Sequence, residues 1–144
     1  MKSISSAQAD FRANDRDWNQ VNDYWRGDIA GLYGLEVRGH AIKLIEWSLA
    51  AADDRPALPT DKVLERWPKA GFWFRALPHD GEKGRGPDRF AACSFPESLE
   101  AGRYGTYIVS EENTVRRRLL GHARGIEFYP PEGQLKNGEW TVID

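Results

Sequence analysis

The sequence predicts an α+β fold in which an N-terminal helix and further short helices pack on an antiparallel β-meander. Three observations support this prediction. Apolar residues recur at spacings of three and four only in the first part of the chain, up to residue 52. From residue 71 onward, short aromatic and β-branched runs alternate with turn residues. No long helical segment separates these runs, which argues against the parallel β-α-β order of a doubly wound nucleotide-binding sheet.

Length and composition place the chain among folded single domains. Its 144 residues fit one domain spanning 1–144, and its aromatic residues supply enough apolar surface for a core. A net charge of −2 gives no bulk attraction to nucleic acid or to an anionic membrane. The single cysteine, Cys93, excludes an intramolecular disulfide and a cysteine-based zinc site, and we expect it to be a small buried residue of a strand.

The first helix is predicted over Lys2–Asn14. Ile4, Ala7 and Phe11 form one apolar stripe, and serine, glutamine and charged residues cover the rest of the surface. A helix this short is marginally stable alone in water. We therefore expect Ile4, Ala7 and Phe11 to dock this helix on the remainder of the domain.

Two more helices and a series of strands are predicted after it. Asp28 is a candidate N-cap for a short helix over 29–33, and apolar spacing predicts a helix over 41–52. His79 is expected in an exposed loop between the first two strands. The strands are expected at 71–77, 90–95, 106–110 and 114–119, with a short one at 125–129 and an apolar C-terminal run at 138–143.

Several segments resemble one group of bacterial proteins. Residues 2–11 (KSISSAQADF) resemble the segment that follows the membrane anchor in type IV pilin-like proteins and type II secretion pseudopilins. Residues 71–77 (GFWFRAL), 90–96 and 104–118 (YGTYIVSEENTVRRR) are similar to the sheet of an uncharacterised pilin-like domain family found in planctomycete-type bacteria. The resemblance spans most of the chain, because residues 14–17 (NDRD) and 21–28 (VNDYWRGD) also fit that family.

The resemblance implies a helix packed on an antiparallel sheet, exported across the inner membrane and anchored at its N-terminus. It implies a location in the periplasm or at the cell surface, with other pilin-like subunits or the envelope secretion machinery as partners. An anchor needs an apolar run of about 20 residues, and this chain begins at Met1 without one. The two interpretations are a domain truncated from an anchored parent, which we expect, and a soluble relative. For the chain as given we expect no membrane contact.

The loop at 15–23 (DRDWNQVND) is the sharpest candidate for a metal site. Oxygen-bearing side chains alternate along it, as in an EF-hand-like calcium loop, and calcium prefers six to eight oxygen ligands. A backbone carbonyl is expected at the seventh position, and the following turn can add one more carboxylate. The candidate ligands are Asp15, Asp17, Asn19, Val21 through its carbonyl, Asp23 and Asp28.

Two positions of this loop depart from the calcium-binding pattern. Gln20 and Arg26 stand where an EF-hand loop has glycine and a bidentate glutamate. The alternative is an Asx-rich turn, in which the same side chains accept hydrogen bonds from backbone N–H groups. In the family that this chain resembles, glycine often stands at the positions of Trp18 and Gln20.

The function that the sequence favours is structural. It contains no evident nucleophile–base pair, cysteine–histidine metal cluster or phosphate-binding loop, so we do not expect an enzyme. The leading hypothesis is a non-catalytic structural or assembly subunit, an exported pilin-like or pseudopilin-like globular head. The alternative is a calcium-supported, adhesin-like extracellular binding module that uses exposed aromatic residues, and calcium is the one cofactor suggested.

Overall fold

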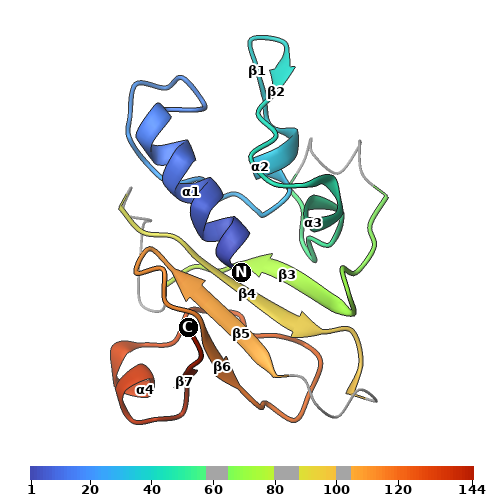
Figure 1. The fold of residues 1–144 in the computed structure, drawn as a ribbon, viewed down its shortest axis with the longest axis vertical. Helices are drawn as coiled ribbons and strands as arrows, with labels where there is room; N and C mark the ends of the chain where they lie inside the picture. Colours follow the sequence, from blue (N-terminus) through green and yellow to red (C-terminus); the bar gives the residue numbers. More distant parts are fainter. Residues whose placement is uncertain (58–64, 80–87, 100–104) are drawn as a thin grey trace.

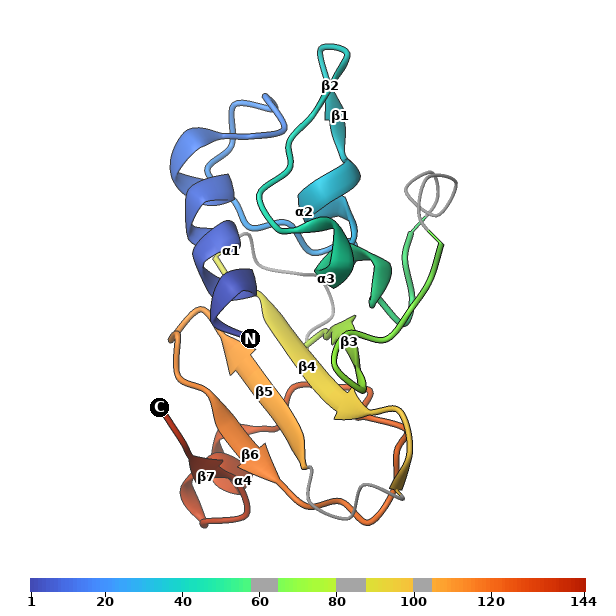
Figure 2. The same ribbon diagram turned by 45° about the vertical axis from the view of Figure 1, so that its right-hand side comes forward.

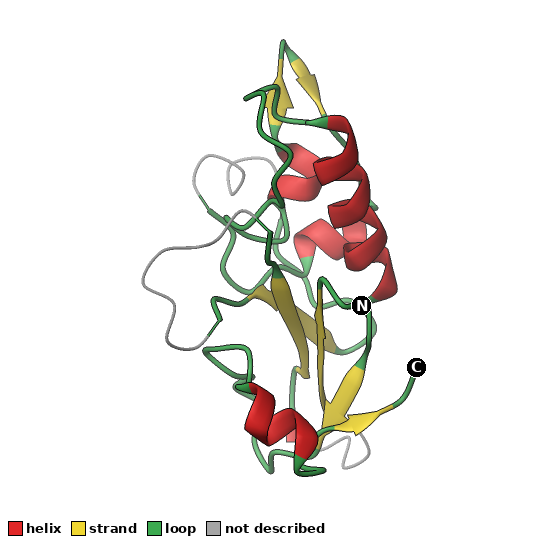
Figure 3. Ribbon diagram, turned by 90° about the vertical axis from the view of Figure 1, so that its left-hand side faces the viewer, coloured by secondary structure: helices red, strands yellow, loops and turns green. Residues whose placement is uncertain are grey.

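The computed structural model describes residues 1–57, 65–79, 88–99 and 105–144, and it confirms the α+β class. A five-stranded antiparallel sheet lies in the middle of the molecule, with the helices of the first half over one face (Figure 1). The C-terminal segment covers the opposite face, so that the sheet is enclosed between two layers (Figure 3). A short turn at 61–67, which Asp61 ahead of apolar residues would favour, lies mostly outside the described residues. The glycine-rich segment at 81–86 lies entirely outside them.

Helix α1 (Lys2–Asn14) has the bounds that the apolar stripe predicts. Ile4, Ala7 and Phe11 are all buried, and the Phe11 ring lies 6.0 Å from the ring of Trp25. The helix ends where Asp15 takes a left-handed conformation, with φ at 44°. Its packing on strand β5 and on helix α2 fixes which face remains open to solvent. No helix among the described residues is both long enough and apolar enough to cross a membrane.

The segment after α1 differs from its prediction. The short helix α2 (Gly31–Gly34) is present, but the helix expected over 41–52 is reduced to α3 (Trp47–Ala51). Residues 36–41 instead form a hairpin of β1 (Glu36–Val37) and β2 (His40–Ala41). The reason lies in the backbone, because the N–H groups of Ile42, Lys43 and Leu44 donate to carbonyls of residues 32–35 rather than along a helix. Apolar spacing alone does not reveal this alternative set of partners.

The main sheet has the strand order β3-β4-β5-β6-β7, with every neighbouring pair antiparallel. The residues expected as a strand at 125–129 form no strand in the described chain, and Tyr129 makes only an isolated bridge with His79. The C-terminal run forms the last strand, after a helix, α4 (Glu132–Lys136), that the sequence did not predict. The strand bounds are β3 Phe72–Ala76, β4 Ala91–Pro96, β5 Thr106–Ser110, β6 Arg116–Arg118 and β7 Thr141–Val142.

Alternation along the strands builds two separate cores. On the helix side, Phe74, Ala92 and Val109 meet the buried residues of α1, α2 and α3. On the other side, Cys93 and Trp140 belong to a cluster with residues of β3, β5 and the C-terminal segment. Cys93 is fully buried, as predicted from its place in a strand. Both faces of the sheet are therefore buried, and neither half of the chain can bury its apolar surface without the other.

We expect Phe11→Asp to lower the free energy of unfolding by several kcal/mol, because it places an unpaired charge in a fully buried site. The matched control is Ser6→Asp, which introduces the same charge on the exposed face of the same helix and should change stability by less than about 0.5 kcal/mol. Urea unfolding followed by tryptophan fluorescence measures both. Equal unfolding midpoints for the two variants would contradict the docking of α1 through Phe11.

Candidate functional site

The loop after α1 is ordered by its own acidic and amide side chains. The Asp15 carboxylate accepts hydrogen bonds from the backbone N–H groups of Asn19 (3.2 Å) and Gln20 (2.9 Å). The Asp17 carboxylate accepts from the side-chain amide of Asn19 at 2.9 Å, and the Asn19 side-chain oxygen accepts from the backbone N–H of Val21 at 2.7 Å. These are the contacts of an Asx-rich turn.

The same loop brings three of the predicted calcium ligands together. Burial, together with the nearby carboxylates of Asp15 and Asp23, raises the pKa of Asp17 above its ordinary value. One carboxylate oxygen of Asp23 is buried and has no hydrogen-bond partner among the described residues. Asp28 lies apart from this group, in the interior. No group of three or more His, Cys, Asp and Glu side chains in the described part of the chain is placed to hold a metal ion.

The side chain of Trp18 protrudes from this loop, and Arg38 packs against one face of its ring. Its side chain is 55% exposed, and the guanidinium carbon of Arg38 lies 3.2 Å from the centroid of its ring. Arg38 belongs to the turn between β1 and β2, so that the loop at 15–23 and the hairpin at 36–41 form one end of the molecule (Figure 2). We call these two segments the tip. The backbone of Trp18 and Gln20 is left-handed, with φ at 58° and 65°.

Asp28 and Asp53 form a buried pair of carboxylates beneath α2. Asp53 accepts from the backbone N–H groups of Ile29 and Ala30, both at 2.7 Å. Asp28 accepts from the Trp25 indole N–H at 2.9 Å and from the Gly31 N–H at 2.7 Å. It therefore contacts the start of α2, but the N-cap residue of this helix is Ala30 rather than Asp28, the residue that the sequence predicts. Burial and the adjacent Asp28 raise the pKa of Asp53 to about 6, although the N–H donors partly offset them.

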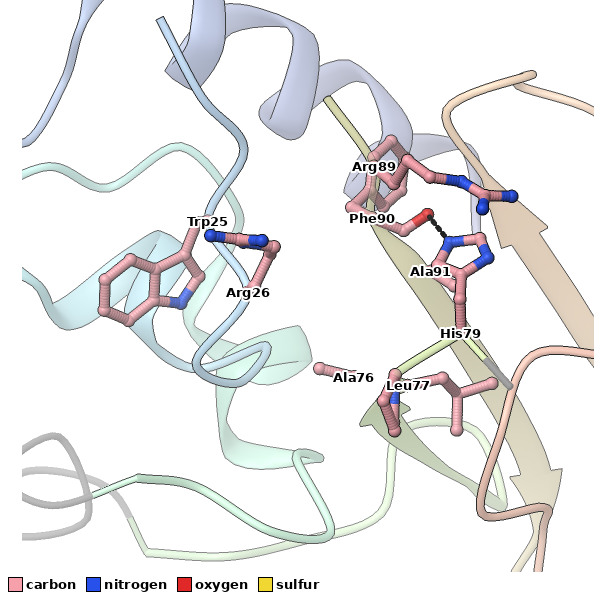
Figure 4. A pocket seen from close by; sticks show the side chains of 9 residues that line it. Trp25, Arg26, Ala76, Leu77, His79, Arg89, Phe90 and Ala91 are labelled. Carbon is pink, nitrogen blue, oxygen red and sulfur yellow. Dashed lines mark hydrogen bonds between the residues drawn. The ribbon is translucent and has the colours of Figure 1, made fainter. Parts of the chain in front are cut away.

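His79 is not the exposed loop residue that the sequence predicts. Only 8% of it is exposed, its Nε2 lies 3.3 Å from the Phe90 carbonyl oxygen, and its ring lies 4.9 Å from that of Tyr129. It lines a hollow of about 20 Å³ between the loop carrying Trp25 and the start of β4 (Figure 4). That volume has room for one water molecule.

A larger hollow, of about 460 Å³, lies on the other side of His79. Its carboxylates already have cationic neighbours, since Arg89 contacts Glu111 at 3.2 Å and other ion pairs hold Glu112 and Glu132. Burial raises the pKa of Glu111, but contacts with His79 and Arg89 outweigh burial and hold this pKa below its ordinary value. Charges paired in this way leave the hollow without an excess of one sign.

The thiol of Cys93 is unsuited to act as a nucleophile. Burial raises the pKa of Cys93 to about 12, so the thiolate that acts as a nucleophile is not formed near neutral pH. Comparisons with protein-family models, with curated proteins and with solved structures gave no match for this chain. The features of this molecule that bear on its function are therefore geometric, above all α1 and the tip.

The stacked pair at the tip was not found by sequence reasoning. The hairpin has a local signal, because Arg38-Gly39 lies between two short runs that contain Val37 and Ala41, and glycine favours the turn there. The pairing of Trp18 with Arg38 has no local signal in the sequence, because these residues come from two loops that meet only in the folded chain.

Because the folded-state pKa of Asp53 is above its unfolded value of 3.8, the folded chain binds this proton more tightly. This contribution to stability is therefore greatest in acid and is lost as the pH rises through about 6. We expect Asp53→Asn to remove it. Between pH 5 and pH 7.5 the difference in unfolding free energy between wild type and variant should change by on the order of 1 kcal/mol. Urea unfolding at both pH values measures this, and parallel pH profiles would contradict it.

Proposed function

We propose that this chain is a non-catalytic structural or assembly subunit, the globular head of a pilin-like or pseudopilin-like protein. In this proposal it is exported to the periplasm or the cell surface and packs against other pilin-like subunits or the envelope secretion machinery. The observation that carries the proposal is the two-sided character of α1. One side of the helix docks on the domain, and the other is open and built from short side chains.

The inner side of α1 is fixed by more than its apolar stripe. The Gln8 side-chain oxygen accepts from the Trp25 backbone N–H at 2.9 Å, and the Gln8 amide also donates to the Trp25 carbonyl. This reciprocal pair sets the rotation of the helix about its own axis, in addition to the burial of Ile4 and Phe11. The outward face is therefore the same in every copy, which is what a repeated assembly contact requires.

The outer side of α1 suits close contact with another helix. Its exposed residues include four with short side chains, and short side chains at a contact allow two helix axes to approach at the lower end of the usual separation of about 8–10 Å. Burying this face against a neighbour costs little side-chain conformational entropy. These residues are Ser3, Ser6, Ala9 and Ala13.

The backbone of the tip agrees with one feature of the resemblance. Trp18 and Gln20 hold left-handed conformations, which glycine adopts without a steric penalty. These are the two positions at which the pilin-like family often carries glycine. A loop of the same backbone shape in that family would explain why glycine is frequent there.

The assembly contact can be tested by disulfide trapping in cells that produce the protein. Ser6→Cys and Ala9→Cys place a thiol on the outer face of α1, while Cys93 is buried and does not compete. We expect oxidation to give covalent dimers through both positions. The matched control is Gln134→Cys, which is equally exposed but lies on α4, in the layer on the other side of the sheet (Figure 3). Absence of dimers at both α1 positions, or equal yields at position 134, would contradict the proposal.

A second candidate function is a calcium-supported, adhesin-like binding module that uses exposed aromatics. The gathering of Asp15, Asp17 and Asp23 favours it, because calcium prefers hard oxygen ligands and would offset the repulsion by which Asp15 and Asp23 help to raise the pKa of Asp17. The unpartnered oxygen of Asp23 would be available as a ligand. Trp18 would then be an exposed aromatic residue held in place by the occupied loop.

If calcium binds this loop, millimolar calcium should raise the melting temperature, because a ligand that binds only the folded state stabilises it. The double variant Asp15→Ala, Asp17→Ala should lose the increase. The matched control is Glu46→Ala, Glu132→Ala, which removes two exposed carboxylates elsewhere and should keep it. Differential scanning calorimetry with and without calcium measures the shift. A melting temperature that does not respond to calcium would contradict this second function.

A further inference from the structure

We propose that the larger hollow beside His79 binds a small uncharged saccharide. This site goes beyond the assembly role, because the hollow lies against the C-terminal segment, in the layer on the other side of the sheet from α1 (Figure 3). Three observations carry the proposal. They are an acceptor nitrogen that no described residue partners, charges that are already paired with one another, and walls that combine apolar and hydroxyl-bearing side chains.

One ring nitrogen of His79 has no partner among the described residues. The other, Nε2, lies 3.3 Å from the Phe90 carbonyl oxygen and 3.7 Å from a carboxylate oxygen of Glu111, and both of these oxygens only accept hydrogen bonds. Nε2 therefore carries the hydrogen of the neutral ring, and Nδ1 is left with a lone pair that accepts. Figure 4 shows this second nitrogen on the side of the ring that is turned away from Trp25 and Arg26.

This nitrogen lies where a ligand in the larger hollow can reach it. His79 lines both hollows, and the small one has room for only one water molecule. Because the His79 side chain is 8% exposed, bulk water has little access to Nδ1. A buried acceptor without a donor destabilises the folded state, and a ligand O–H group that donates to it removes that cost. The ligand is therefore one that carries a hydrogen-bond donor.

Two side chains with hydroxyl groups line the same hollow. They belong to Ser110 and Tyr129, which are 1% and 4% exposed. Burial raises the pKa of Tyr129, so its hydroxyl keeps its proton near neutral pH. Since a ligand hydroxyl both donates and accepts, a ligand with several of them can bond to Nδ1 of His79 and to these two groups at once. A saccharide carries several hydroxyl groups on one small ring.

The charged side chains at and beside this hollow are paired with one another. The pairs are Glu111 with Arg89 at 3.2 Å, Glu112 with Arg116 at 3.5 Å and Glu132 with Lys136. A charged ligand would have to displace a partner that is already in place, whereas an uncharged ligand leaves the pairs intact. Its hydroxyl groups can still donate to the carboxylate oxygens, because each of these has more than one lone pair. The balanced charges therefore favour an uncharged ligand with several donors.

The rest of the wall suits the C–H groups of a sugar ring. Pro130, Pro131 and Leu135 contribute apolar surface, and the ring of His79 packs on that of Tyr129 with a centroid distance of 4.9 Å. A sugar ring has C–H groups on its faces and hydroxyl groups at its edge, so it matches a wall that is apolar in parts and polar in others. The volume of about 460 Å³ is near the lower end of the range of about 300–1,000 Å³ for small-molecule sites, which fits a mono- or disaccharide.

NMR of protein labelled with ¹⁵N in its histidine side chains tests this site at pH 7.5. The probes are glucose, galactose, mannose and maltose, each added to about 0.2 M, a concentration that saturates a site with a millimolar Kd. We expect at least one of these sugars to shift the Nδ1 resonance of His79 in a saturable way. His40 and His122 do not line the hollow and serve as internal controls, because their resonances should not move. Saturable binding of n-butylamine or inorganic phosphate in place of the sugars would overturn the proposal.

Two variants show whether the sugar occupies this hollow. His79→Phe keeps a ring beside Tyr129 but removes Nδ1, and Leu135→Trp fills the hollow while leaving His79 in place. Saturation transfer from the protein to the protons of the sugar should show at least tenfold weaker binding by each variant. The matched control His40→Phe replaces an exposed histidine outside the hollow and should bind the sugar as wild type does. Urea unfolding establishes that each variant is folded, and if His79→Phe is not, Leu135→Trp and the wild-type titration decide.

Three results would overturn the saccharide site. They are a wild type that binds none of the four sugars, a His79 resonance that does not move while a sugar binds, and undiminished binding by the folded variants. The α1 crosslinks do not involve this hollow, so their failure would contradict the assembly role and leave the saccharide site standing. Sugar binding that fails while the crosslinks form would overturn this inference alone.

Discussion

The four residues Ala52–Arg55 join all three layers of this molecule, and the rest of the structure depends on them. Phe74 of β3 donates to the Ala52 carbonyl at 2.9 Å and accepts from the Asp54 N–H at 2.7 Å, so that this segment lies along the edge of the sheet. The carboxylate of Asp53 turns inward and accepts from the backbone N–H groups of Ile29 and Ala30, the two residues just before α2. Since α1 packs on α2 and on the sheet together, the orientation of its open face is set here.

The same segment also secures the opposite face of the sheet through Arg75. This arginine is only 5% exposed, and its guanidinium donates to the Asp54 carboxylate, to Glu127 and to the carbonyls of Arg124 and Ile126. Burying a guanidinium costs several kcal/mol unless its N–H groups and its charge are satisfied. Here the compensation comes from two segments far apart in sequence, so the layer that contains Trp140 is fastened to the layer that contains α3.

Parts of this arrangement could be predicted from the sequence because their causes are local. The stripe of Ile4, Ala7 and Phe11 defines α1, and the alternation around Cys93 defines a strand buried on both faces. The prediction of a helix over 41–52 was wrong because the backbone N–H groups of Lys43 and its neighbours donate to carbonyls in and around α2. The spacing of apolar residues does not reveal these partners. The prediction that His79 lies in an exposed loop was wrong for a related reason. The burial of this side chain depends on Tyr129, which is fifty residues away in sequence.

The tip contains two features that lower the stability of the folded domain, a left-handed backbone at residues with side chains and an exposed indole ring. Left-handed backbone at Asp15, Trp18, Gln20 and Arg38 is disfavoured for residues with side chains, and each such residue costs on the order of 1 kcal/mol or more. An exposed indole adds apolar surface that the domain does not bury. A partner that covered the ring would remove the second cost, whereas the backbone cost is the same with or without a partner. The Arg38 guanidinium, 3.2 Å from the centroid of the ring, holds Trp18 at the tip and away from the core.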